Sequence, residues 1–500
     1  MNIEYTPPSP ASGPAKASFA NGTRLLVAAI ALSYLAAFLS FWLQSAGLIG
    51  PSGILPAGDF LTIVHSQLGP SGWFEVPTLC WLFGTGAAIA VLCAVGMAAA
   101  LCLLCGFAPA LCLLAMWACY LSLVSVGQIF FDFQWDGLLL EATLIAVFLV
   151  PWRLSRTGTA YDPPKLARCL TWWLLFRLMF MSGLVKLTSG DPTWRSLTAL
   201  SFHFETQPLP TVLGWFAAHL PRWIQVLACL LMFVIELAAP LCLIAPRRLR
   251  HAAALSLVLL QVAIAATGNF AFFNLLAIGL CLSCLDDEWW RSVHWGVEAP
   301  VGPTQGRIPR WVSSGALRWF AALSVGVTFF ESVAEAYPGA ARSPLVRFVA
   351  ETVGPLRSFN DYGLFAVMTV ERPELVFEGS NDGRSWKEYT LPYQPGALDA
   401  RPKWIAPLQP RLDWQLWFAA LGPPDNNPWV ETVCERLLRG ERAVTELFAG
   451  NPFPEVPPKY MRVVRYRYEC TSTRERSLSG KWWRRTPLDF YVRPVELPKP

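Results

Sequence analysis

Long apolar runs separated by short polar loops dominate the first two thirds of this chain. A helix needs about 20 apolar residues to cross about 30 Å of hydrocarbon. Runs near that length lie at residues 25–43, 79–105, 108–126, 137–151, 170–187, 225–245, 252–268, 270–284 and 316–334. The runs at 137–151 and 270–284 are short for a span, as tilted or re-entrant helices are. The pattern therefore predicts a polytopic α-helical membrane bundle of about nine spans.

The pattern changes after residue 334. Apolar and polar residues alternate at 364–371, 374–380 and 460–468, which favours strands, and Asp382-Gly383 is typical of a hairpin turn. Residues 429–448 instead have helical spacing. We therefore expect a β-rich, sandwich-like soluble C-terminal domain with a short helix between its strand groups. The predicted organisation is a disordered cytoplasmic leader at 1–20, a transmembrane helical domain at 21–334 and a non-cytoplasmic β-rich domain at 335–500.

Basic residues are concentrated in two of the short loops. Arg153, Arg156, Lys165 and Arg168 precede the run at 170–187, and Arg247, Arg248 and Arg250 precede the run at 252–268. The loop at 44–78 contains no Lys or Arg. Because cytoplasmic loops carry an excess of Lys and Arg, both basic loops are expected in the cytoplasm. An odd number of spans then places the C-terminal domain on the opposite, lumenal or periplasmic side.

Composition narrows the classes of function. Hydrophobic residues make up 54% of the 500 residues, charged residues only 15%, and the net charge is +5. This net charge is small, and the basic residues lie in the loops that are expected in the cytoplasm. The sequence therefore gives no support to nucleic-acid binding. No phosphate-binding loop, dinucleotide fingerprint, G-x-S-x-G elbow or H-E-x-x-H motif is present. The sequence predicts no cofactor and leans against an enzyme.

Thirteen cysteines raise the question of metal or redox chemistry. The pairs Cys102/Cys105 and Cys281/Cys284 lie within apolar runs, where thiols pack as small soft side chains and lack the polar surroundings of a zinc or dithiol site. We therefore predict no metal site. Cys434 and Cys470 are the cysteines of the C-terminal domain, and in an oxidising compartment they are candidates for a disulfide.

Two polar groups interrupt the apolar pattern. Residues 128–141 contain Asp132, Asp136 and Glu141, and the run at 170–187 contains Arg177 and Lys186. Charges in a membrane segment usually face a bundle interior and find partners, or extend to the interface. We keep both interpretations open: snorkelling cations and wet carboxylates, or a pair between Arg177 and Glu141 or Asp136.

The loop after this run adds His203 and Glu205, a weak acid–base candidate because His-x-Glu occurs in many turns. An intrabundle polar site would use Lys186, Arg177, Glu141 and His203 as its weak catalytic candidates.

Aromatic and basic residues alternate near the end of the chain. Alternation from 460 to 468 places one set on a single face, and two tryptophans follow: Tyr460, Arg462, Tyr466, Tyr468, Trp482 and Trp483. Tyr, Trp and Arg are enriched in binding hot spots. These six residues are our candidates for a surface that binds a client protein. The alternative is that the rings form the core of the domain itself.

Extended stretches of the chain resemble the lipase maturation factor family. They include FQWDGLLLE (133–141), FRLMFMSGLVKLTSGDPTWRSLTALSFHFETQPLPT (176–211), TGNFAFFNLL (267–276), FNDYGLFAVMT (359–369) and NPFPEVPPKYMRVVRYRY (451–468). The resemblance covers nearly the whole chain from about residue 45. It implies a membrane protein, resident in the endoplasmic reticulum in eukaryotic members, that helps secreted lipases reach their active folded state. It supplies no catalytic residues.

Ser182–Leu187 is similar, more distantly, to a lysine-containing segment of the membrane region of vitamin K-dependent gamma-carboxylase. That likeness sustains the rival hypothesis of a membrane enzyme or transporter. The chain ends without a Lys-Asp-Glu-Leu type signal, and the C-terminal domain has no Asn-x-Ser/Thr sequon. These features favour a bacterial homologue in the inner membrane. The expected partners are the bilayer and secreted lipases or other exported proteins.

Overall fold

The computed structural model describes residues 18–82, 84–154, 161–295, 315–336 and 344–498. Six helices in these ranges are long and apolar enough to cross a membrane. They are α1 (Ala20–Leu48), α4 (Thr85–Leu104), α5 (Pro109–Val126), α7 (Lys165–Thr188), α11 (Arg222–Leu241, continued by a 3-10 turn to Ile244) and α12 (Arg247–Thr267). Each coincides with a predicted apolar run. The chain is thus a multi-pass membrane protein.

Three further predicted spans correspond to helices outside this group of six. They are α6 (Gln134–Val147), α13 (Phe273–Leu282) and α15 (Leu317–Ala336). At 14 and 10 residues, α6 and α13 are too short to cross the hydrocarbon perpendicular to the bilayer. Most of α6 is buried between its neighbours. The count of about nine spans is therefore not confirmed.

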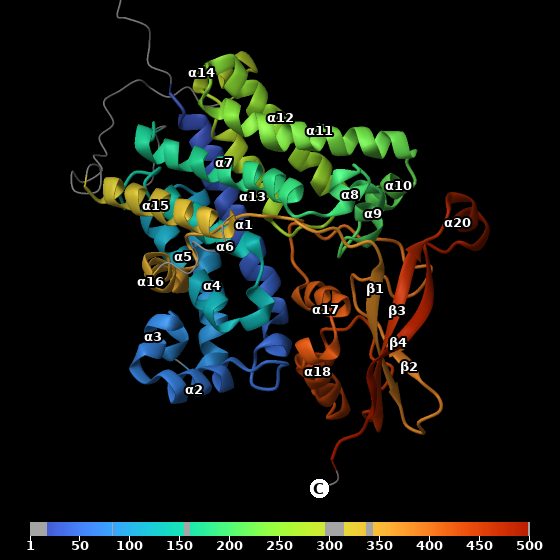
Figure 1. The fold of residues 1–500 in the computed structure, drawn as a ribbon. Coiled ribbons are helices and arrows are strands. Elements are labelled where there is room, and N and C mark those ends of the chain that lie inside the picture. The colour runs from blue at the N-terminus through green and yellow to red at the C-terminus, as the bar shows by residue number, and fades with distance from the viewer. Residues whose placement is uncertain (1–17, 83, 155–160, 296–314, 337–343, 499–500) are drawn as a thin grey trace, which may run out of the picture.

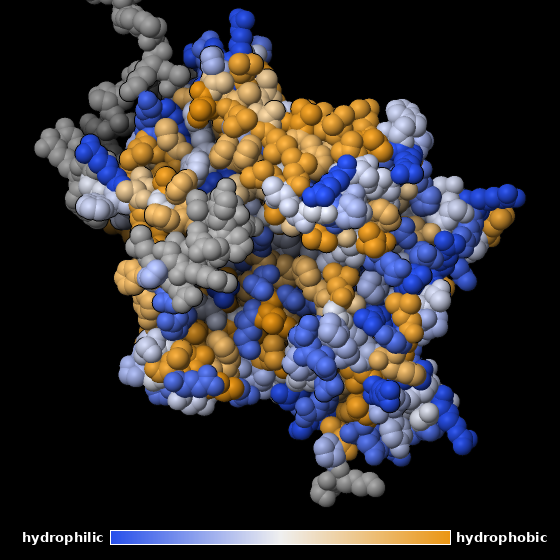
Figure 2. Space-filling view, in the orientation of Figure 1, coloured by the Kyte–Doolittle hydropathy of each residue, from blue (hydrophilic) through white to orange (hydrophobic). Residues whose placement is uncertain are grey.

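Short helices connect or flank these spans. They are α2 (Ala57–Leu68), α3 (Gly72–Glu75), α8 (Pro192–Arg195), α9 (Ala199–Thr206), α10 (Val212–Ala218), α14 (Asp287–Ser292) and α16 (Pro344–Val353). The apolar faces of α11 and α12 remain exposed, with Leu227 55% and Leu259 69% accessible. Figure 2 shows them as a broad hydrophobic area on the upper part of the molecule. Such a large apolar surface is expected where a helix faces lipid.

The C-terminal domain contains one antiparallel sheet in the order β2-β1-β3-β4. Its strands are β1 (Arg372–Ser380), β2 (Lys387–Tyr389), β3 (Tyr460–Cys470) and β4 (Trp483–Val495), and its helices are α17 (Arg411–Leu421), α18 (Trp429–Leu438), α19 (Arg442–Thr445) and α20 (Thr473–Ser479). In Figure 1 α17 and α18 lie between the sheet and the helical domain. They cover the inner face of the sheet, so the predicted sandwich is wrong.

Of three local predictions in this domain, two are confirmed and one is wrong. The Asp382-Gly383 hairpin is confirmed, because β1 pairs with β2 and the Asp382 carboxylate accepts hydrogen bonds from the amides of Arg384 and Ser385. The helix expected at 429–448 is also confirmed, as α18 and α19. The strand expected at 364–371 is wrong. Its backbone is held by side chains of the membrane domain, as where the Met368 amide donates to Asp191 at 2.8 Å.

The two basic loops of the membrane domain lie at one end. The guanidinium of Arg168 lies 4.0 Å from the ring centre of Phe19, and that of Arg250 lies 5.3 Å from the same ring centre. The beginnings of α1, α7 and α12 therefore meet there, as both basic loops were predicted to do.

The C-terminal domain contacts the opposite end. Gln44, near the end of α1, donates to the Gln409 carbonyl at 2.8 Å, and Asn269, after α12, donates to the Lys403 carbonyl at 2.8 Å.

Candidate functional site

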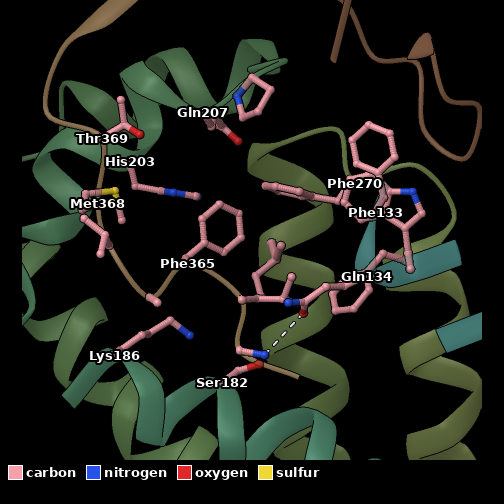
Figure 3. A pocket seen from close by; sticks show the side chains of 18 of the residues that line it. Phe133, Gln134, Ser182, Lys186, His203, Gln207, Phe270, Phe365, Met368 and Thr369 are labelled. Carbon is pink, nitrogen blue, oxygen red and sulfur yellow. Dashed lines mark hydrogen bonds between the residues drawn. The ribbon is translucent and has the colours of Figure 1, made fainter. Parts of the chain in front are cut away.

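A cavity of about 440 Å³ lies where the membrane and C-terminal domains meet (Figure 3). Its walls come from α7, α9, α11, α12, α13 and α17, from the residues just before and within α6, and from the loop at 363–369. Aromatic side chains dominate the walls: Phe133, Trp135, Phe270, Phe273, Phe365, Trp414, Trp417 and Phe418. The polar side chains of the lining are Asp132, Gln134, Ser182, Lys186, His203, Thr206, Gln207, Glu236, Gln261 and Thr369.

The loop at 363–369 reaches the cavity because buried contacts anchor it. The Gly363 amide donates to Gln134 at 3.4 Å, shown dashed in Figure 3, and the indole of Trp194 donates to the Phe365 carbonyl at 3.0 Å. These anchors, together with the Asp191 bond to Met368, replace a strand ladder. The resemblance motif at 359–369 thus forms the joint between the two domains.

Lys186 lies in the cavity wall and is paired. Its ammonium group donates to both carboxylate oxygens of Glu236 on α11, at 3.0 and 2.8 Å, and both side chains are more than nine-tenths buried. The Lys186 side chain therefore does not extend to the membrane interface in this structure. Glu236 was not predicted from the sequence as the partner of Lys186. A single carboxylate within an apolar run, four residues before Pro240, was the sequence feature that could have indicated it.

Arg177 forms a separate buried cluster outside the cavity. It pairs with Glu141 on α6, as one of the alternatives predicted, and also donates to the Asn360 carbonyl at 2.6 Å. Tyr362 donates to Glu141 at 2.7 Å. Gly137 permits this approach, since a Cβ there would lie 2.7 Å from the Asn360 side-chain oxygen. Arg177 and Glu141 thus hold the joint in place and do not share a site with Lys186.

Asp136 has a partner that the sequence did not indicate. Arg411, at the start of α17, donates to the two Asp136 oxygens at 3.0 Å each and to the Tyr120 hydroxyl at 3.1 Å. Its side chain is fully buried. This pair joins the C-terminal domain to α6 and was missed because arginine is common in soluble domains.

His203 and Glu205 do not act together. The His203 ring points into the cavity, between Phe270 and Phe365 (Figure 3). Glu205 turns away to accept a hydrogen bond from the Cys470 amide at 2.9 Å. Burial and the neighbouring charge of Lys186 lower the pKa of His203 to about 4, so the imidazole is neutral at pH 7.

Three of the six client-binding candidates are interior residues. Tyr468, Trp482 and Trp483 are at most 7% exposed, and Trp482 packs against Trp215 of α10 with ring centres 5.1 Å apart. These rings belong to the core, the alternative left open above, because the sheet docks on the membrane domain there. Tyr460, Arg462 and Tyr466 are half-buried on the same face of β3.

The disulfide candidate is corrected as well. Cys434 and Cys470 are both free thiols in this structure. Cys434 packs in the main core through α18, whereas Cys470 lies at the end of β3 beside the Trp482 cluster. They belong to two different clusters of the domain. No group of three or more His, Cys, Asp or Glu suited to a metal occurs among the described residues.

Sequence comparison assigns the family. Residues 22–292 match the lipase maturation factor transmembrane domain, and residues 358–493 match the lipase maturation factor C-terminal domain. The chain belongs to the lipase maturation factor family. Lipase maturation factor 2 of Gallus gallus is 35% identical, over 95% of this chain and 81% of the relative.

Human members of the family are similarly close. Lipase maturation factor 2 of Homo sapiens is 35% identical over 95% of this chain and 83% of its own length. Lipase maturation factor 1 of Homo sapiens is 32% identical over 98% of this chain and 92% of its own length. No solved structure matches the chain.

Proposed function

We propose that this lipase maturation factor family protein is a membrane maturation factor that helps secreted lipases, or related exported proteins, reach their active fold. Its relatives are named for that role. One observation supports a division of labour: the C-terminal domain is fixed to the bundle at the end opposite the basic loops. By the positive-inside rule that end is lumenal or periplasmic, where an exported client folds. The compartment is the endoplasmic reticulum in a eukaryote and the inner membrane in a bacterium.

The outer face of the sheet is the surface we propose for client binding. The Arg462 guanidinium stacks 4.1 Å from the Trp386 ring centre and 5.5 Å from that of Phe490. Phe490 is 52% exposed. Arg462 is held by Glu378 at 2.6 Å, so its planar group is oriented before any partner arrives. An exposed and a half-buried aromatic ring around an ordered arginine are typical of binding hot spots.

Replacing an exposed ring tests this surface without disturbing the core. Phe490→Ser, expressed with a secreted lipase in cells that lack their own maturation factor, should lower the activity of secreted lipase several-fold. Tyr466→Ser, which also removes a hydrogen bond to Glu378, should act in the same direction. Lipase activity per secreted molecule and the amount of the membrane protein are measured together.

Leu478→Ser is the matched control, because Leu478 is 80% exposed on α20 and outside this face. Equal activity for all three variants at equal protein levels would remove the outer sheet face from client binding. A loss of the membrane protein itself in Tyr466→Ser would assign that ring to the folding of the domain instead.

A second candidate function, a membrane enzyme or transporter, is favoured by one observation: Lys186 and His203 line the same cavity. The double variant Lys186→Met/Glu236→Leu removes both buried charges together and leaves neither unpaired. If it retained normal protein levels but abolished maturation, while Phe490→Ser had no effect, the activity would be located in the cavity. The maturation-factor proposal predicts the reverse, with truncation after residue 340 as the damaging change.

A further inference from the structure

The cavity has the size and lining of a ligand site. Its volume of about 440 Å³ is within the range of roughly 300–1,000 Å³ found for small-molecule pockets. Eight aromatic side chains, contributed by both domains, line it. Three lining residues, Val367, Phe418 and Leu421, are 69%, 45% and 41% exposed and form an apolar rim. An apolar rim around an apolar cavity suits a ligand that enters from a membrane or micelle, and not one that enters from water.

Two polar groups in the lining have hydrogen-bonding capacity left over. The Gln207 side chain is 2% exposed, and its amide oxygen has no hydrogen-bond partner in the described part of the chain. This oxygen packs against Gly268 and is closed off from the cavity, whereas Figure 3 shows the His203 ring pointing into the cavity. No hydrogen bond within the described residues engages either His203 ring nitrogen. His203 is half-buried, so its two ring nitrogens are the hydrogen-bonding groups available to an occupant of this corner.

The charge of the lining selects the kind of head group. Lys186 and Glu236 are bound to each other by two hydrogen bonds, and together they contribute no net charge. The imidazole of His203 is neutral, and the remaining charged residue of the lining, Asp132, is an exposed carboxylate. A phosphate or carboxylate would thus enter an apolar cavity without a free cation, which is strongly unfavourable. A hydroxyl or ester group instead forms a hydrogen bond with His203 and brings no charge into the cavity.

We propose that the cavity binds a neutral single-chain lipid, of the monoacylglycerol type, with its hydroxyl-bearing head at His203 and its acyl chain along the aromatic wall. The site is independent of the client-binding surface on the sheet. It lies at the joint between the domains, so an occupant contacts both α17 and the membrane helices.

The test uses a photoreactive monoacylglycerol with a diazirine in the acyl chain, added to the full chain in detergent micelles. Labelled peptides are identified by mass spectrometry. We expect labelling in residues 363–369 and in α17, and competition by monooleoylglycerol but not by oleate. His203→Phe keeps a ring of similar size and removes both nitrogens. The loss of one neutral hydrogen bond should raise the monooleoylglycerol concentration for half-competition by about 3- to 10-fold.

Two further variants complete the test. Ser182→Phe fills the cavity from α7 and should abolish the cavity label, and His65→Phe, on α2 and outside the cavity lining, is the matched control with unchanged labelling. Labels spread over the exposed faces of α11 and α12, and insensitive to His203→Phe, would show annular lipid only and overturn the proposal. Competition by oleate equal to that by monooleoylglycerol would overturn the neutral head group.

The lipase assay is separate from this experiment. Cavity labelling that survives while Phe490→Ser leaves lipase activity unchanged would support the lipid site and contradict the client-binding surface. Loss of lipase activity in Phe490→Ser with no cavity labelling would do the opposite. Each proposal can therefore fail without the other.

Discussion

Arg411→Met should release the C-terminal domain from the membrane bundle. The guanidinium of Arg411 is fully buried, donates to both Asp136 oxygens and to Tyr120, and lies 3.7 Å from the Phe131 ring centre. Methionine keeps the apolar volume of the side chain but removes the charge. Asp136, which is 1% exposed, would then be a buried carboxylate without its cation.

Breaking a buried ion pair on one side destabilises by about 3–5 kcal/mol. Because every 1.4 kcal/mol is a factor of ten, the population of molecules with an undocked C-terminal domain should rise by at least about 100-fold. The double variant Arg411→Met/Asp136→Leu removes both charges, so it should recover much of this loss. A coupling of several kcal/mol between the two positions is the specific signature of the pair.

Limited proteolysis in detergent measures this population when opening is fast relative to cleavage. The rate of release of a fragment carrying the C-terminal domain, followed with a C-terminal tag, should increase at least about 100-fold in Arg411→Met. Arg439→Met is the control. Arg439 pairs with Glu435 on the surface of α18, where both side chains are about half exposed, and exposed pairs contribute about 0–1 kcal/mol. Equal cleavage rates for the two variants would refute the reasoning.

Three further changes test the cavity and its walls. Gly268→Ala should lower the melting temperature and the folded yield, because a Cβ there would lie 2.0 Å from the Gln207 amide oxygen; a normal yield would contradict that packing. Glu236→Gln leaves the buried Lys186 without its counter-ion and should destabilise the bundle by about 3–5 kcal/mol, seen as lost monodisperse protein in gel filtration, whereas Lys186→Met/Glu236→Leu should be largely restored. Because the pKa of His203 is lowered to about 4, this residue is protonated near pH 6.5 in the unfolded chain but only near pH 4 in the folded chain. The melting temperature should therefore be constant above about pH 7 and fall as the pH drops from 6.5 to 4. His203→Phe should reduce part of that fall.

The membrane domain could be predicted largely from local composition. The run at 108–126 became α5 at Pro109–Val126, within one residue at its start. Hydrocarbon leaves a helix few alternatives, because every backbone polar group must be satisfied within the segment. The short runs at 137–151 and 270–284 were harder. Whether such a helix spans, tilts or packs inside the bundle depends on its neighbours.

In the C-terminal domain, local sequence patterns predicted single elements but not how those elements pack. The Asp382 turn and the helix after Trp429 are encoded in a few adjacent residues. We predicted a sandwich because the apolar face of an alternating strand must pack against another layer, and a second sheet would provide that layer. Helix α17, which contributes part of that cover, arises from RLDWQLWFAAL (411–421), a segment that alternation alone did not flag.

The sequence by itself determined that this chain is a multi-pass membrane protein with a separate C-terminal domain, that its basic loops share one end, and that it resembles the lipase maturation factor family. Hydropathy, charge bias and long motifs are properties of adjacent residues, so they can be read without coordinates. Only the tertiary structure decided which buried charges meet: Lys186 with Glu236, Arg177 with Glu141, and Arg411 with Asp136, the last pair 275 residues apart. Such partners are fixed by how helices and domains pack, and the cavity, which of these residues only Lys186 and Glu236 line, exists only once both domains are in place.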